Sequence, residues 1–100
     1  MPSVYTTDRF DRWFGALRDL SAKRRIQARI DRVEDGHFGD HKLTREKVFE
    51  MRVQHGPGYR VYYMLRGLDV VILLAGGDKS SQVADIEMAV WEAKQLDRKK

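Results

Sequence analysis

The segment His55-Gly-Pro-Gly58 restricts the fold more than any other part of the chain. These turn-forming residues separate two runs, residues 48–53 and 59–66, in which apolar and polar side chains alternate. Alternation with a period of two is typical of half-buried strands. The pattern therefore predicts two antiparallel strands joined by a short hairpin.

The position of this turn also predicts which residues face each other. If the turn is centred on Gly56, residues whose numbers sum to about 112 are cross-strand partners. Arg52 then lies opposite Arg60, and Glu50 lies opposite Tyr62. Because side chains two positions apart share a face, these four residues are expected on one side of the sheet.

The rest of the chain predicts an α+β fold. We expect a small antiparallel sheet of three to four strands, with an N-terminal helical hairpin on one face and a C-terminal helix. Spacing of apolar residues places helices at 6–20, 21–36 and 80–96, a further strand at 69–75, a possible edge strand at 3–6 and an irregular connection at 37–47.

Length and composition favour a single domain spanning residues 1–100. There is no cysteine, the longest apolar run is "VVILLA", and the N-terminus lacks the pattern of a secretory signal. These features predict a cytoplasmic protein that does not enter a membrane. The net charge of +4 is consistent with an anionic partner such as nucleic acid, or with a solvated basic surface.

The two arginines beside the hairpin suggest a phosphate site. Like charges directly opposite each other in a sheet repel, at a cost of up to about 1 kcal/mol. Guanidinium groups grip phosphate in a bidentate manner, so a bound phosphate would offset that cost for Arg52 and Arg60. Tyr62 could stack on a base or relay a proton. In the alternative interpretation, Arg52 pairs with Glu50 or another acid on the sheet surface.

The segment "GGDK" at residues 76–79 supplies a further cation. Lys79 directly precedes the C-terminal helix, where unpaired backbone N–H groups favour an anion. An ordinary strand-to-helix turn capped by Asp78 or Ser80 would give the same sequence. The spacing is not that of a phosphate-binding P-loop.

Other basic residues are candidates for substrate binding. Arg25 and Arg29 belong to a basic stripe on the second helix, which could steer RNA, receive an acidic partner or simply be solvated. Lys42, in the connecting segment, is a further candidate. His55 could be a general acid or base, or only a turn residue.

We expect no metal site. His37 and His41 are four residues apart, but they lie in a glycine-containing loop rather than on a helix.

Four segments together carry a resemblance to a known family. Residues 10–19, 25–42, 49–63 and 73–89 resemble the RelE/ParE toxin superfamily, and most closely its HigB-like branch of phage Gp49-related "addiction module killer proteins". The motif "GPGYR" followed by "GGDK" at this spacing is much more specific than either piece alone.

The resemblance implies a RelE-like microbial-RNase fold and a toxin of a type II toxin–antitoxin system. Many such toxins cleave mRNA in the ribosomal A site. A cognate antitoxin, usually with a helix-turn-helix domain, neutralises the toxin and represses the operon, so that operator DNA is contacted through the antitoxin. Carried over by position, the matching catalytic candidates are Arg52, Arg60, Tyr62 and Lys79.

The implied reaction needs no cofactor. The 2′-hydroxyl of mRNA attacks the adjacent phosphorus while Arg60 and Lys79 stabilise the charge on the phosphate oxygens. Two alternatives remain open: a ParE-like inhibitor of DNA gyrase on the same fold, or an RNA-binding module without enzymatic activity.

Overall fold

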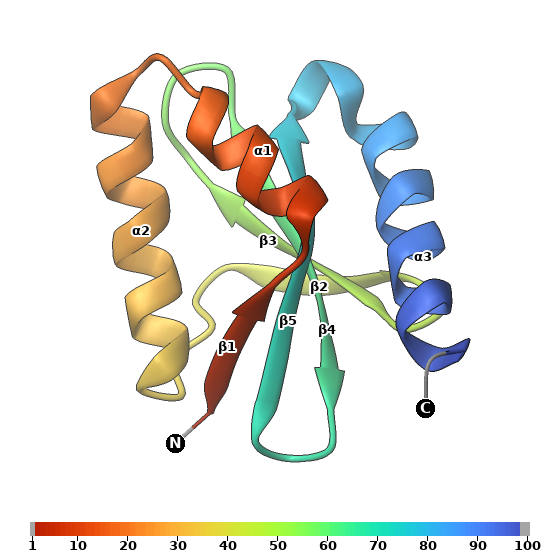
Figure 1. Cartoon of the computed structure of the whole chain (residues 1–100). Coiled ribbons are helices and arrows are strands. Elements are labelled where there is room, and N and C mark those ends of the chain that lie inside the picture. Colours follow the sequence, from red (N-terminus) through yellow and green to blue (C-terminus); the bar gives the residue numbers. More distant parts are fainter. Residues whose placement is uncertain (1, 99–100) are drawn as a thin grey trace.

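The computed structural model describes residues 2–98 and has an α+β fold. A five-stranded sheet in the order β1-β5-β4-β3-β2 carries helices on both faces (Figure 1). The helices and strands are β1 (Ser3–Thr6), α1 (Asp8–Ala16), α2 (Leu20–Glu34), β2 (His41–Arg45), β3 (Val48–Val53), β4 (Tyr59–Arg66), β5 (Val70–Asp78), a short 3-10 turn (Lys79–Ser81) and α3 (Gln82–Arg98).

The register of the β3–β4 hairpin is the one the sequence predicts. Arg52 pairs with Arg60, and Glu50 pairs with Tyr62. The loop needs its glycines, since both Gly56 and Gly58 adopt positive φ angles (56° and 81°) that other residues rarely tolerate. The amide of Gly58 also donates to the carbonyl of His55 at 3.1 Å, which closes the turn.

Two expectations about the sheet are wrong in part. The sheet has five strands and is mixed, because the edge strand β1 pairs parallel to β5. The segment expected to be an irregular connection contains β2, which pairs antiparallel to β3 through a bulge between Leu43 and Arg45. Its exposed, charged side chains are typical of an edge strand and hide its periodicity. The turn into β3 places Glu46 at φ 52° instead of using a glycine.

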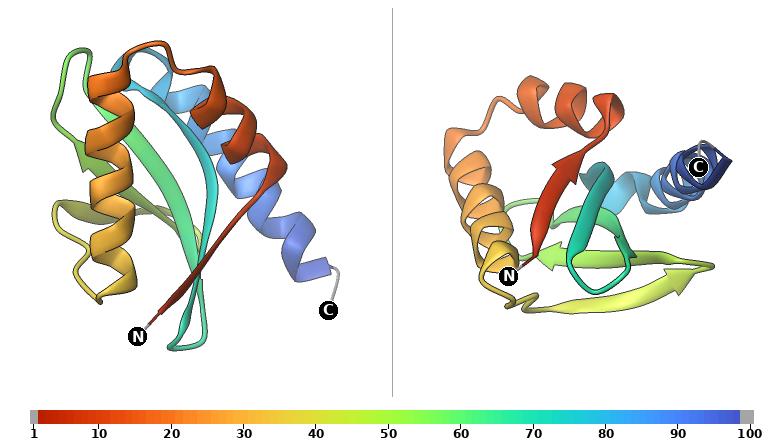
Figure 2. Two further views of the ribbon diagram at one scale, coloured as in Figure 1. Left: turned by 60° about the vertical axis from the view of Figure 1, so that its left-hand side comes forward. Right: turned by 60° about the horizontal axis from the view of Figure 1, so that its bottom comes forward.

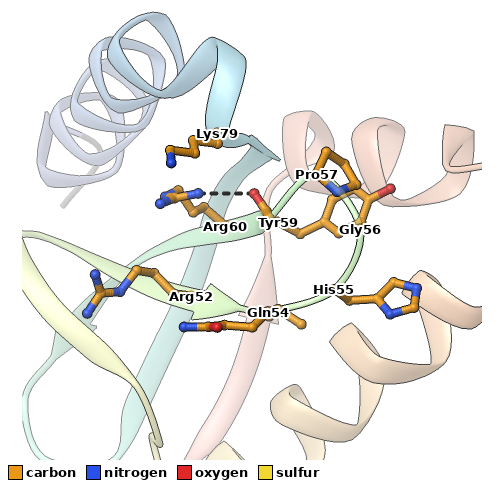
Figure 3. Close-up of a pocket in the computed structure, with 10 residues that line it drawn as sticks. Arg52, Gln54, His55, Gly56, Pro57, Tyr59, Arg60 and Lys79 are labelled. Carbon is orange, nitrogen blue, oxygen red and sulfur yellow. Dashed lines mark hydrogen bonds between the residues drawn. The ribbon is translucent and has the colours of Figure 1, made fainter.

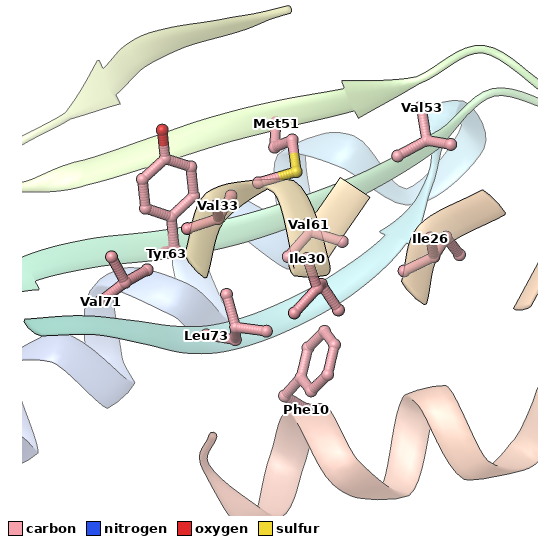
Figure 4. Packing of buried hydrophobic residues seen from close by; sticks show 10 residues of the cluster. All are labelled: Phe10, Ile26, Ile30, Val33, Met51, Val53, Val61, Tyr63, Val71 and Leu73. Carbon is pink, nitrogen blue, oxygen red and sulfur yellow. The ribbon is translucent and has the colours of Figure 1, made fainter. Parts of the chain in front are cut away.

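The sheet separates two apolar clusters. On one face, α1 and α2 pack on the side chains of the three central strands (Figure 4). On the other face, Ala89, Val90 and Ala93 of α3 cover Tyr62 and its neighbours. The views in Figure 2 show α2 and α3 on opposite sides of the sheet. Burial on both faces explains the uninterrupted apolar run in β5.

The expected antiparallel helical hairpin does not form. Leu17 turns the chain into an extended conformation after α1, and Asp19 caps α2 by accepting from the Ala22 amide at 3.1 Å. Figures 1 and 2 show that α1 does not lie alongside α2. Instead, α1 packs over β5 while α2 covers β1 and β3.

The contact between α1 and β5 requires a residue without a side chain at position 76, and a substitution can test this. A Cβ atom at this position would overlap the Trp13 indole ring, whereas a Cβ at Gly15 on α1 would meet nothing within 4 Å. We expect Gly76→Ala to lower the free energy of unfolding by about 1–3 kcal/mol. The control Gly15→Ala should be neutral or stabilising by up to about 1 kcal/mol. Urea denaturation of both variants measures this, and equal effects would contradict the packing.

Within residues 2–98, no helix has the length and apolar character needed to cross a membrane.

Candidate functional site

An open cleft lies at the end of the β3–β4 hairpin. Its volume is about 550 Å³, and Figure 3 shows the residues around it. Lys79 lies near the hairpin residues because β5 pairs with β4. Asp78, the last residue of β5, lies opposite Tyr59, and Lys79 follows it and lines the cleft together with Arg60. The polar side chains that line the cleft are Arg52, Gln54, His55, Tyr59, Arg60 and Lys79.

Arg60 is the most constrained cation of the cleft. Its Nη1 donates to the carbonyl of Gly58 at 3.0 Å, and its Nε lies 3.4 Å from Glu50 Oε1. The side chain is only 13% exposed. The guanidinium still lines the cleft, because Gly58 has no side chain to cover it: a Cβ there would lie 3.5 Å from Arg60 Nη1.

Arg52 is paired, but the pair is accessible to solvent. Its Nη2 donates to Asp40 Oδ1 at 2.8 Å, and both side chains are 39% exposed. The sequence left open a pairing with Glu50 or another acid, and the partner is Asp40. Exposed ion pairs contribute no more than about 1 kcal/mol, so an incoming phosphate can compete with this carboxylate.

Lys79 is the exposed cation of the cleft. It begins the 3-10 turn, and Asp78 caps that turn by accepting from the amide and the hydroxyl of Ser80. These hydrogen bonds lower the pKa of Asp78. Among residues 2–98, no carboxylate forms an ion pair with Lys79, which leaves its charge available to an anion.

Tyr62 does not reach the cleft. The ring is fully buried in the cluster beneath α3, so it cannot stack on a base in this structure. Burial, together with the nearby carboxylates of Glu50 and Asp85, raises the pKa of the Tyr62 hydroxyl. The phenol is therefore protonated at neutral pH and is not a general base. The register was right, but the sequence did not show that α3 covers this position.

The burial of Tyr62 leads to a prediction. Its hydroxyl makes no hydrogen bond to residues 2–98, so Tyr62→Phe should change the free energy of unfolding by less than about 1 kcal/mol. Urea denaturation of the variant and the wild-type protein measures this. A larger loss of stability would show that the hydroxyl makes a stabilising contact.

His55 points away from the arginines. Figure 3 shows its ring directed to the side of the loop opposite Arg52. Its Nε2 lies 3.4 Å from Asp19 Oδ2, at the start of α2. The pKa of Asp19 is lowered mainly by the backbone hydrogen bond from Ala22, with a contribution from His55. This histidine ties the hairpin loop to α2.

Arg29 is held by three backbone carbonyls. It donates to the carbonyls of Arg52, Phe38 and Asp40, and these hydrogen bonds join α2 to β3 and to the loop before β2. Burial lowers the pKa of its guanidinium. These contacts favour a structural role for Arg29, and its expected role in substrate binding stays a prediction.

The two other basic candidates lie outside the cleft. Arg25 is exposed and lines an adjacent cavity of about 440 Å³, which Arg52 also lines. Lys42, on the edge strand β2, places its Nζ 3.9 Å from Glu50 Oε2. Of the candidate residues, the cleft thus contains Arg52, Arg60, Lys79 and His55.

Glu50 is the polar residue that sequence reasoning overlooked. It was expected opposite Tyr62, but its burial beneath α3 depends on tertiary packing. One feature of the sequence could have indicated its importance: it is an acidic residue between apolar neighbours in a strand that is covered on both faces.

No metal site accompanies these residues. In the part of the chain that the structure describes, no three His, Asp or Glu side chains group in a way that could hold a metal ion.

One family model matches most of the chain. Residues 12–97 match the family model "Phage derived protein Gp49-like (DUF891)". A protein of Haemophilus influenzae named "Uncharacterized protein" is 46% identical over 93 residues, covering 93% of this chain and 94% of the relative. No solved structure matches. The chain therefore belongs to the phage-derived Gp49-like family, which is associated with toxin–antitoxin systems.

Proposed function

We propose that this protein is the toxin of a type II toxin–antitoxin system and that it stops translation by cleaving mRNA on the ribosome. One observation carries the proposal: Arg52 of β3, Arg60 of β4 and Lys79 of the 3-10 turn after β5 converge on a single open cleft. Stability does not require this arrangement, because cations that face one another repel. The family's association with toxin–antitoxin systems supports the same function.

The proposed reaction is a transesterification within the RNA chain. The 2′-hydroxyl oxygen attacks the adjacent phosphorus and loses its proton, the bond to the 5′-oxygen breaks, and that oxygen takes up a proton. The products are a 2′,3′-cyclic phosphate and a free 5′-hydroxyl. Arg60 and Lys79 stabilise the negative charge on the phosphate oxygens, and Arg52 positions the neighbouring backbone once it leaves Asp40.

In this proposal, the ribosome helps to position the reacting groups of the mRNA. The cleft offers cations, but His55 faces Asp19 and Tyr62 is buried, so neither of these two candidate bases is directed at the cations of the cleft. Alignment of the attacking oxygen with the leaving group by the decoding site would supply much of the rate.

The second partner in this proposal is a cognate antitoxin with a helix-turn-helix domain. The toxin would contact operator DNA only through this antitoxin.

Induced expression followed by 5′-end mapping of cellular transcripts tests this function. The proposal predicts growth arrest and new 5′-hydroxyl ends within translated codons. DNA damage with intact mRNA would instead support gyrase inhibition. RNA binding without new ends would support a non-enzymatic module.

A further inference from the structure

Glu50 is a carboxylate in an unusual environment. Its side chain is 0% exposed, because it lies between the first turn of α3 and the central strands. Placing a charge out of contact with water is costly unless other groups compensate it. Replacing a buried ion pair by apolar residues often leaves stability unchanged or improves it, so stability alone is a weak reason for this acid.

The contacts of Glu50 converge on one oxygen. Its Oε1 accepts a hydrogen bond from Gln82 Nε2 at 2.7 Å and lies 3.4 Å from Arg60 Nε. The Lys42 amine lies 3.9 Å from the other oxygen, Oε2, which accepts no hydrogen bond from residues 2–98. Glu50 on β3 therefore connects α3, β4 and β2 behind Arg60, which lines the cleft.

These contacts fix the direction of the Arg60 guanidinium. Glu50 Oε1 lies 3.4 Å from Nε, an ion-pair contact without a hydrogen bond, while the carbonyl of Gly58 accepts from Nη1 at 3.0 Å. A guanidinium has five N–H donors in a rigid plane, so two anchors on one plane define its orientation. The remaining donors can meet a ligand in the cleft that Arg60 lines.

We propose that Glu50 is a positioning residue that holds Arg60 in the orientation required to grip an RNA phosphate, and that Gln82 links this pair to the start of α3. The inference rests on the proposed function for its catalytic consequence. Glu50 itself touches no substrate, because it is enclosed beneath α3. Its negative charge also opposes anion binding, so its contribution is orientation and not affinity.

The substitution Glu50→Gln separates these two contributions. It keeps the size of the side chain and an oxygen for Gln82 but removes the charge that faces Arg60. In a ribosome-dependent cleavage assay we expect kcat to fall about 10- to 100-fold, because small misplacement of a catalytic group is costly. KM should stay the same or decrease, since a negative charge near the phosphate has been removed. The matched control is Glu87→Gln, which makes the same change of charge on the exposed side of α3 and should leave both constants unchanged.

An NMR measurement reads the orientation of Arg60 without using activity. The ¹H–¹⁵N signal of Arg60 Nε–H, assigned by its absence in Arg60→Lys, should be resolved and slow to exchange in the wild-type protein. In the folded Glu50→Gln protein, the Arg60 Nε–H signal should shift to the position of the Nε–H signals of exposed arginines and exchange faster with water. If Glu50→Gln fails to fold, Gln82→Ala provides the second variant, with the same but weaker change expected.

The two readouts distinguish the possible failures. Unchanged kcat in a folded Glu50→Gln protein, or an unchanged Arg60 Nε–H signal, would overturn the positioning role. If the wild-type protein cleaves no RNA, the proposed function fails and the Nε–H signal alone decides whether Glu50 orients Arg60.

Discussion

Replacing Arg60 or Lys79 by alanine is expected to abolish growth arrest and to lower the rate of mRNA cleavage by about 10²–10³-fold for each residue, the range typical of a lost group that stabilises transition-state charge. Both side chains line the cleft and approach the backbone at Gly58, which offers space to a ligand. Arg60→Lys should also be strongly impaired, because an ammonium keeps the charge but not the planar group that donates to the Gly58 carbonyl and forms an ion pair with Glu50.

Loss of cleavage must be separated from loss of folding. Lys79 is exposed, so its variant should unfold at the same denaturant concentration as the wild type. Arg60→Ala leaves the buried Glu50 with only its more distant contact to Lys42 among residues 2–98, and a moderate destabilisation is expected there. Arg45→Ala, on the edge strand and outside the cleft, provides a control that should retain full toxicity. Toxic, fully active Lys79→Ala protein would contradict the assignment.

Replacing Arg29 by alanine is expected to lower the free energy of unfolding by about 2–4 kcal/mol, because three backbone carbonyls lose a charged hydrogen-bond donor at once. Arg25→Ala, four residues earlier on the same helix and exposed, should change stability by no more than about 0.5 kcal/mol. Chemical denaturation of both variants gives the comparison. An Arg29→Ala protein of wild-type stability that has lost RNA cleavage would show that this guanidinium acts on substrate.

The sequence could predict the hairpin because its information is local. A glycine-containing turn with fixed φ requirements sets the register, and the register in turn places Arg52 opposite Arg60. The position of Lys79 also follows from local order, since it directly follows the strand that pairs with β4. The convergence of cations was therefore predictable without any knowledge of the helices.

The burial of individual residues was not predictable in the same way. Tyr62 and Arg60 share a face of the sheet, but only Tyr62 lies beneath α3, because the helix covers one part of that face and leaves the hairpin end open. The path of α3 depends on its own packing through Ala89 and Ala93, which alternation in β4 does not reveal. The same reasoning applies to Glu50, whose polar character suggested a surface position.

Edge strands were the other source of error. β2 consists mainly of exposed polar residues, and β1 is a four-residue strand whose direction relative to β5 depends on how α1 and α2 cross the sheet. Short strands with little buried area carry weak periodicity. Their pairing is decided by the partner strand and not by their own side chains.

An NMR titration with a short 2′-O-methyl RNA, which cannot undergo attack by its own 2′-oxygen, tests most directly whether the cleft grips a nucleic-acid backbone. We expect the side-chain signals of Arg52, Arg60 and Lys79 to shift together with the backbone amides of the hairpin loop. The logarithm of the affinity should fall with the logarithm of the salt concentration with a slope of roughly −2 for three phosphate contacts. Shifts confined to another surface, such as the exposed side of α3 around Trp91, or an affinity independent of salt, would contradict the account.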